Sequence, residues 1–159
     1  MTHSDRAKRD YVNLYDHIKS YECYGDDRLH PFRNVFLDDD TFCQTSSSLD
    51  SGHLLFNIEF TRTIHLREIK FMAPVMGGPK KVKVFINQMF TNFSTPKVAL
   101  PSAKLEYEIE DLTNKEWKKE LPKVGRFPQT NSVSIFIESN HENVDYTVIS
   151  HMILYGIIA

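Results

Sequence analysis

Residues 77–87 read Gly-Gly-Pro-Lys-Lys-Val-Lys-Val-Phe-Ile-Asn, and this stretch decides the fold. The Gly-Gly-Pro sequence predicts a tight turn, and the residues after it alternate with the two-residue period of a β-strand. The face that we assign to a core consists of Val82, Val84 and Ile86. The opposite face, which a partner could touch together with the turn, consists of Lys81, Lys83 and Phe85.

The same alternation recurs along the chain, with polar turns between the segments. The predicted strands cover residues 54–60, 64–73, 81–87, 105–109, 133–137 and 146–158. A short turn is expected at Thr61-Arg62, between the first two of them. Together with weaker segments this makes about eight short strands, and such a pattern predicts an all-β protein, an antiparallel β-sandwich of the jelly-roll type.

The remaining segments carry little strand pattern. Four apolar residues at helical spacing predict a short N-terminal helix that packs on the sandwich: Tyr11, Leu14, Tyr15 and Ile18. Residues 1–10 are polar and are expected to be flexible, whereas residues 20–52 and 88–103 have the composition of loops. Residues 11–159 are expected to form a single domain.

Composition excludes several classes of function. The chain has 159 residues with a net charge of −2, which does not favour a nucleic-acid or anionic-membrane partner. No apolar run is long enough to span a membrane, and no secretory signal is recognised, so we expect a monomeric cytoplasmic or nuclear protein. The two cysteines, Cys23 and Cys43, are expected to be buried free thiols.

The sequence offers no convincing catalytic or metal site. The seven histidines lack the His-Glu-x-x-His spacing of a zinc site. The acidic run Asp38-Asp39-Asp40, with Asp26-Asp27 upstream, could supply oxygen ligands to calcium, but a solvated acidic loop is the better interpretation. There is no Gly-x-Ser-x-Gly motif. We therefore expect no cofactor, no metal and no enzymatic activity.

Two surface features invite a binding hypothesis. The basic residues Arg67, Lys70, Lys80, Lys81 and Lys83 could form a nucleic-acid patch, but exposed lysines also protect strand edges, and the balanced charge favours that second interpretation. The apolar residues of the loop at 88–103 either cap the end of the sandwich or form an exposed interaction tip. Capping is the preferred interpretation, yet among the loops this one is the first choice for a partner contact. The candidate contact residues are Gly77, Gly78, Met89, Phe90, Asn92, Phe93, Asp38, Asp39 and Asp40.

Several fragments, taken in order, resemble the PITH domain, a proteasome-interacting module found beside thioredoxin in some proteins. They are Asn13-Leu14-Tyr15, Glu22-Cys23, Asp40-Thr41-Phe42, Leu54-Leu55, Gly78-Pro79-Lys80 with residues 82–87, residues 131–137, and the closing segment from Thr147-Val148-Ile149 to Tyr155-Gly156. The resemblance covers roughly residues 11–156. It implies a galactose-binding-like jelly roll, no enzymatic activity, and docking on the 26S proteasome, usually beside its regulatory particle.

The chain also departs from the family pattern. The family's acidic stretch before its first core strand is replaced by Gln-Thr-Ser-Ser-Ser-Leu-Asp-Ser-Gly-His at residues 44–53. The family's arginine in the closing strand is Val148 here. These departures bear on the identity of the partner more than on the fold.

A second hypothesis belongs to another class. Jelly rolls are often used to bind sugars or other small ligands, and this argument is one of analogy. A sugar could stack on an aromatic ring beside an amide side chain, and the chain offers Phe93 with Asn92, or Trp117 with Asn114.

Overall fold

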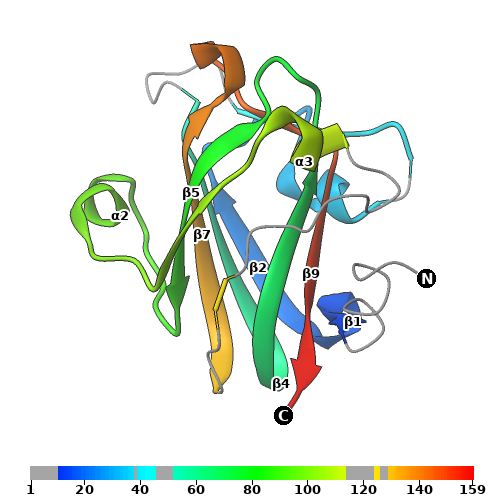
Figure 1. Ribbon diagram of the computed structural model, residues 1–159, viewed down its shortest axis with the longest axis vertical. Coiled ribbons are helices and arrows are strands. Elements are labelled where there is room, and N and C mark those ends of the chain that lie inside the picture. The colour runs from blue at the N-terminus through cyan, green and yellow to red at the C-terminus, as the bar shows by residue number, and fades with distance from the viewer. Residues whose placement is uncertain (1–10, 38, 46–51, 114–123, 126–128) are drawn as a thin grey trace.

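The structure, a computed structural model, describes residues 11–37, 39–45, 52–113, 124–125 and 129–159, and the statements below concern these residues (Figure 1). The long strand β4 (Leu54–Met72) belongs to both layers of a β-sandwich. Its first part pairs with β2 (Ile18–Tyr24) and with β7 (Thr130–Asn140). Beyond β7 this first layer continues with β5 (Pro79–Ile86) and β6 (Ala103–Glu106). All these pairings are antiparallel.

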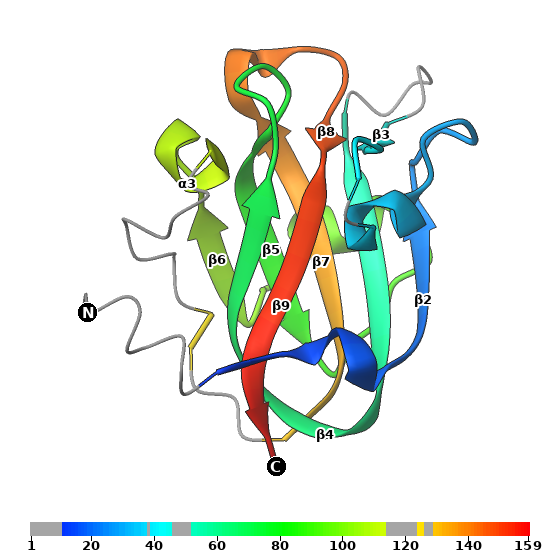
Figure 2. The same cartoon turned by 90° about the vertical axis from the view of Figure 1, so that its right-hand side faces the viewer.

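The second layer starts where β4 changes partners. The register with β7 shifts between Glu59 and Ile64, and from Ile64 onward β4 pairs with β9 (His151–Ile158). The far edge of β9 carries the short strand β1 (Val12–Asn13). Figure 2 shows β4 turning at the bottom of the view from one layer into the other. The prediction of a turn at Thr61-Arg62 is therefore wrong, because the single strand β4 spans both predicted segments.

Short elements complete the chain. A separate small sheet pairs β3 (Cys43–Gln44) with β8 (Val148–Ile149). The helical turns are η1 (Leu14–His17), η2 (Phe32–Phe36), α2 (Ser94–Val98), α3 (Ile109–Thr113) and η3 (His141–Asn143). None of the helices in the described part of the chain is long and apolar enough to cross a membrane.

The main core lies between the two layers and follows the predicted alternation. The first layer contributes Phe56, Ile58, Val82, Val84, Val133, Ile135 and Ile137. The second layer contributes Ile64, Leu66, Ile69, Phe71, Met152 and Leu154. At roughly 1.5–3 kcal/mol for each fully buried large apolar side chain, this interface is the main source of stability. Val82 and Val84 are buried as predicted, while Ile86 is half-buried and packs at the margin.

The outer face of the first layer is covered, which the sequence did not indicate. Phe85 on β5 forms a second buried cluster with Leu55 and Phe136, and the loop residues Phe90 and Phe93 pack against it. The capping interpretation of this loop thus agrees with the structure, but the loop covers a sheet face rather than an end of the sandwich. Figure 1 shows α2 and its flanking loop beside β5 and β7.

Lys83 was expected on a solvent face and is instead buried beneath this loop. Its ammonium group donates hydrogen bonds to the carbonyl oxygens of Pro96 (3.3 Å) and Lys97 (2.8 Å). It also forms an ion pair of 3.1 Å with Glu138. Lys70 is buried as well, so the five basic residues do not make one exposed patch. Burial lowers the pKa of Lys70 to about 8, against the opposing attraction of Asp111 and Glu68.

Other secondary-structure predictions also need correction. The expected N-terminal helix is only the 3₁₀ turn η1, because Val12–Asn13 pairs with β9 and Ile18 already begins β2. Residues 20–52 are not all loop, since η2, β3 and the greater part of β2 lie within them. The strand predicted at 105–109 ends at Glu106, and Ile109 begins α3. Likewise the last predicted strand is divided into β8 and β9, and the loop at 88–103 contains α2.

Candidate docking surface

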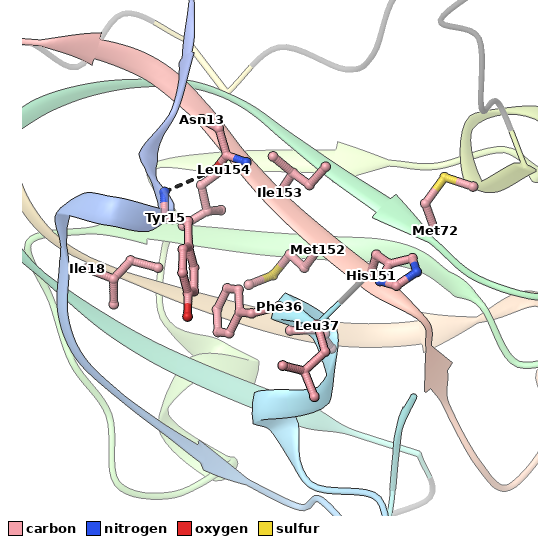
Figure 3. Close-up of a pocket in the computed structure, with 11 residues that line it drawn as sticks. Asn13, Tyr15, Ile18, Phe36, Leu37, Met72, His151, Met152, Ile153 and Leu154 are labelled. Carbon is pink, nitrogen blue, oxygen red and sulfur yellow. Dashed lines mark hydrogen bonds between the residues drawn. The ribbon is translucent and has the colours of Figure 1, made fainter. Parts of the chain in front are cut away.

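An apolar hollow lies beside β9, where the two 3₁₀ turns of the N-terminal region meet the second layer (Figure 3). Its volume is about 330 Å³. One wall is formed by Tyr15 and Phe36, whose ring centroids are 5.3 Å apart, together with Leu37. Tyr15 is 50% exposed and Leu37 is 43% exposed, so large apolar side chains border this hollow while still facing solvent. Such a surface is typical of a contact site for another molecule.

Local hydrogen bonds hold this wall in place. The side chain of Asn13 caps η1 by accepting a hydrogen bond of 3.0 Å from the backbone N–H of Tyr15. The backbone N–H of Leu37 donates to the carbonyl oxygen of Asn34 at 3.1 Å and so ends η2. The side chain of Asn34 in turn donates to the carbonyl oxygen of Phe42 at 3.0 Å. The aromatic wall therefore stands on fixed turns before any partner arrives.

A second hollow, of about 510 Å³, adjoins the first where β8 leads into the start of β9. It is lined by Asp39 and Asp40 on one side and shares Met72 and His151 with the first hollow. We name the two hollows together the β9 groove. It follows the chain from Val148 to Leu154, which is at most about 20 Å at the ~3.3 Å rise per residue of a strand, because Ser150 forms a bend between β8 and β9.

The acidic end of the groove is organised by its own loop. A side-chain oxygen of Asp39 accepts hydrogen bonds from the hydroxyl group of Thr41 and from its backbone N–H, the latter at 2.9 Å. These bonds, foremost that of the hydroxyl, lower the pKa of Asp39, and the nearby His151 adds a smaller effect. Asp39 is therefore ionised at neutral pH, and its carboxylate faces the same hollow as His151.

The predicted contact residues of the Gly-Gly-Pro turn lie inside the protein. Gly77 and Gly78 are both buried, because Tyr146 packs against Gly77 and Leu112 packs against Gly78. The N–H of Gly77 donates to the carbonyl oxygen of His141 at 3.0 Å, and the N–H of His141 donates to that of Gly78 at 2.8 Å. The exposed apolar residues of this turn are Val75 and Met76. A partner at this turn would touch those two side chains rather than the glycines.

The other predicted contact loop is far from the acidic run. Met89 is exposed, Phe90 and Phe93 pack on the outer cluster, and the side-chain oxygen of Asn92 accepts a hydrogen bond of 2.8 Å from the N–H of Thr95 in the first turn of α2. Figure 1 places α2 and β9 on opposite sides of the sandwich. The structure therefore does not bring this loop together with Asp39 and Asp40. Asp38 lies outside the described residues.

The groove residues of the N-terminal segment were not among the predicted contacts. Tyr15 was assigned to the apolar side of a short helix, and Phe36 and Leu37 lie in the loop predicted at residues 20–52. Met72 and His151 carried no distinguishing signal, because each is one residue of an alternating strand. Only the fold brings these segments together, from positions more than a hundred residues apart in the chain.

The structure also bears on the alternative chemistries. No group of three metal-ligating side chains occurs among the described residues. Asp26 and Asp27 accept backbone hydrogen bonds from Phe32 and Leu29 and so serve their own turns. Cys23 and Cys43 are free, and desolvation by burial raises the pKa of both thiols.

The residues considered for stacking a sugar give no support to that use. The ring of Phe93 lies beside those of His53 (6.1 Å between centroids) and Phe136 (6.3 Å). The side-chain oxygen of Asn92 already accepts a hydrogen bond from the N–H of Thr95. Trp117 and Asn114 lie outside the described residues.

Solved structures confirm the jelly-roll fold. The chain is similar to the CBM32-1 and CBM32-2 domains of ZmpB from Clostridium perfringens in complex with GalNAc (TM-score 0.67, 16% identity), covering 98% of this chain but only 38% of that one. It is similar to the family 32 CBM of C. perfringens NanJ in complex with galactose (TM-score 0.64, 11% identity, covering 91% and 98%). It also resembles the F5/8 type C domain of a Bacteroides fragilis protein (TM-score 0.65, 10% identity, covering 94% and 99%). These likenesses show a galactose-binding-like jelly roll and not a ligand.

The sequence comparison with protein families is more specific. The model of the PITH domain matches residues 4–159, which is nearly the entire chain. This match includes β5, which lies between β7 and β6 in the first layer, and the residues that line the β9 groove. The chain therefore belongs to the PITH domain family.

Proposed function

We propose that this chain is a non-enzymatic protein-interaction module that docks on the 26S proteasome, at or beside its regulatory particle. The observation that carries the proposal is the match to the PITH domain over residues 4–159. Carbohydrate-binding and F5/8 type C domains of the same fold are likewise binding modules rather than enzymes, which supports the non-enzymatic part. The protein is proposed to act as a monomer in the cytoplasm or nucleus, with neither nucleic acid nor a membrane as its partner.

The β9 groove is the surface that we propose for this contact. It combines exposed apolar side chains, Tyr15 and Leu37, with a fixed backbone beneath them. Interface centres are enriched in tyrosine and other large apolar residues that a partner can cover completely. The loop that contains Asn92 and Phe93 offers less apolar surface to a partner, because its aromatic rings already pack on the sandwich.

Recovery of the proteasome from a cell lysate tests the proposal. The tagged chain is incubated with a lysate of its own cells at low and moderate salt, and the captured proteins are identified by mass spectrometry. Subunits of the regulatory particle are expected, at several times their level on an empty resin. A Leu37→Glu variant, which changes a half-exposed side chain, is expected to recover at least about fivefold less, because hot-spot residues contribute 1–2 kcal/mol or more.

Two controls make the result decisive. The variant Leu100→Glu changes a strongly exposed leucine outside the groove and is expected to recover the wild-type amount. Circular dichroism and melting curves must show that both variants are folded. Failure of the wild-type chain to recover any proteasome subunit at either salt concentration would sink the proteasome proposal. Equal recovery by wild type and Leu37→Glu would exclude the β9 groove as the contact.

A further inference from the structure

The two ends of the β9 groove differ in chemistry. The first hollow is bordered by Tyr15, Phe36 and Leu37, whereas the second carries Asp39 and Asp40. Among the described residues that line either hollow none is Lys or Arg, and the only carboxylates are those of Asp39 and Asp40. The groove thus runs from an apolar end near Leu154 to an acidic end near Val148.

The acidic end is preformed and accessible. Asp39 and Asp40 are both exposed, so a partner can reach their side chains. Thr41 holds the carboxylate of Asp39 through two hydrogen bonds, and Asn34 anchors the next residue, Phe42, to η2. Charges at the margin of an interface select partners of the opposite sign and speed their association.

The order of the two hollows along β8 and β9 indicates the shape of the occupant. They succeed each other over about 20 Å, and an extended chain of about six residues has that length. The side chains on one face of an extended chain are separated by two residues, so successive ones can enter successive hollows.

We propose that the β9 groove binds an extended segment of a protein partner in which apolar side chains precede or follow a lysine or arginine. This rests on the function proposed above, that of a protein-interaction module. The apolar side chains occupy the hollow between Tyr15, Phe36 and Leu37. The cationic side chain reaches the carboxylates of Asp39 and Asp40 at the other end.

Synthetic peptides test this inference without the proteasome. The probes are three fluorescein-labelled decapeptides that alternate leucine with arginine, leucine with glutamate, and serine with arginine, and binding to the full chain is followed by fluorescence anisotropy. The leucine–arginine peptide is expected to bind the wild-type chain, and more weakly as salt is added, because exposed charges are screened. The other two peptides are expected to bind at least about fivefold more weakly, since each lacks one of the two contacts.

Variants locate the contact. The double variant Asp39→Asn/Asp40→Asn is expected to weaken binding of the leucine–arginine peptide about tenfold, as the loss of two exposed charge pairs implies. The matched control Glu106→Gln/Glu142→Gln removes two exposed carboxylates outside the groove and is expected to leave the affinity unchanged. Leu37→Ser is expected to weaken the same peptide while the serine–arginine peptide is unaffected.

Each contrary outcome has a distinct meaning. Equal binding of the leucine–glutamate peptide overturns the assignment of a cation, and equal binding of the serine–arginine peptide overturns that of an apolar contact. If no peptide binds, or if both double variants behave alike, the β9 groove is not a site for such a segment. In all of these cases recovery of the proteasome from the lysate still decides the proposed function separately.

Discussion

Replacing Asn57 with alanine is expected to detach the loop that covers the outer face of the first layer. Asn57 is 1% exposed, and its amide group donates to the carbonyl oxygen of Phe90 at 2.7 Å and to Glu22 at 3.0 Å. Its side-chain oxygen accepts from the hydroxyl group of Ser134 and from the N–H of Phe90 at 3.4 Å. One side chain therefore satisfies both backbone groups of a loop residue above the sheet.

The magnitude follows from these bonds. A hydrogen bond contributes about 1 kcal/mol net, and a buried polar group left without a partner costs about 1–3 kcal/mol. The single hydroxyl hydrogen of Ser134 can donate instead to the carbonyl oxygen of Gln88, 2.7 Å away, so the loss falls mainly on Phe90 and Glu22. We expect the free energy of unfolding to fall by about 2–4 kcal/mol, which lowers the melting temperature of a domain of this size by about 5–15 °C.

Urea titration and hydrogen exchange measure the two parts of this expectation. Urea unfolding gives the loss of stability, and exchange at residues 88–99 shows whether the loop opens before the rest of the sandwich. Asn131→Ala is the matched control, because Asn131 is exposed and accepts a side-chain hydrogen bond of 2.8 Å from Thr63. The free energy of unfolding of this control variant is expected to fall by less than about 1 kcal/mol. A loss below ~0.5 kcal/mol for Asn57→Ala, or unchanged exchange in the loop, would refute this reasoning.

Three further changes have defined outcomes. Gly156→Ala is expected to abolish or severely reduce folding, because a Cβ would lie 2.2 Å from the carbonyl oxygen of His65, and a wild-type melting curve would contradict this. The free energy of unfolding of the wild-type chain, relative to that of Lys70→Met, is expected to rise by about 1–3 kcal/mol between pH 7.5 and 9.5, because the pKa of Lys70 is about 8 in the folded chain and the unfolded chain binds that proton more tightly. The thiols of Cys23 and Cys43, whose pKa values burial raises, oppose this rise in both proteins, so the difference between the two proteins is what is measured. An identical pH dependence of both proteins would exclude this role of Lys70. Cys23 and Cys43 are expected to react at least about tenfold more slowly with a thiol reagent in the folded chain at pH 8 than in urea, and equal rates would show that the thiols are not protected.

The alternation of apolar residues predicted the inner face of the sandwich but not the outer one. A two-residue period places Val82 and Val84 opposite Lys83 and Phe85, and this arrangement is correct. The two-residue alternation does not indicate whether a loop that follows in the sequence covers the outer face of the strand. Lys83 is buried because the carbonyl groups of Pro96 and Lys97 reach its ammonium group, and these residues lie beyond the reach of any local pattern.

The candidate site was predictable only in part. The sequence identified Asp39 and Asp40 as an exposed acidic segment, and the structure places both at the β9 groove. The sequence could not identify Tyr15 and Leu37 as contact residues, because their exposure depends on how two 3₁₀ turns meet β9. For the same reason the glycines of the Gly-Gly-Pro turn were assigned to the surface, although the chain at His141 closes over them.

The strand β4 joins two parts of the molecule that have different tasks. Its first part contains Asn57, which anchors the loop over the outer face, and its second part pairs with β9, which forms the floor of the groove. Neither layer can separate from the other without breaking this one strand, so both are expected to unfold in a single transition. A partner that binds the groove would accordingly slow the opening of the whole sandwich, and the protection would extend to amides of β7 that it never touches.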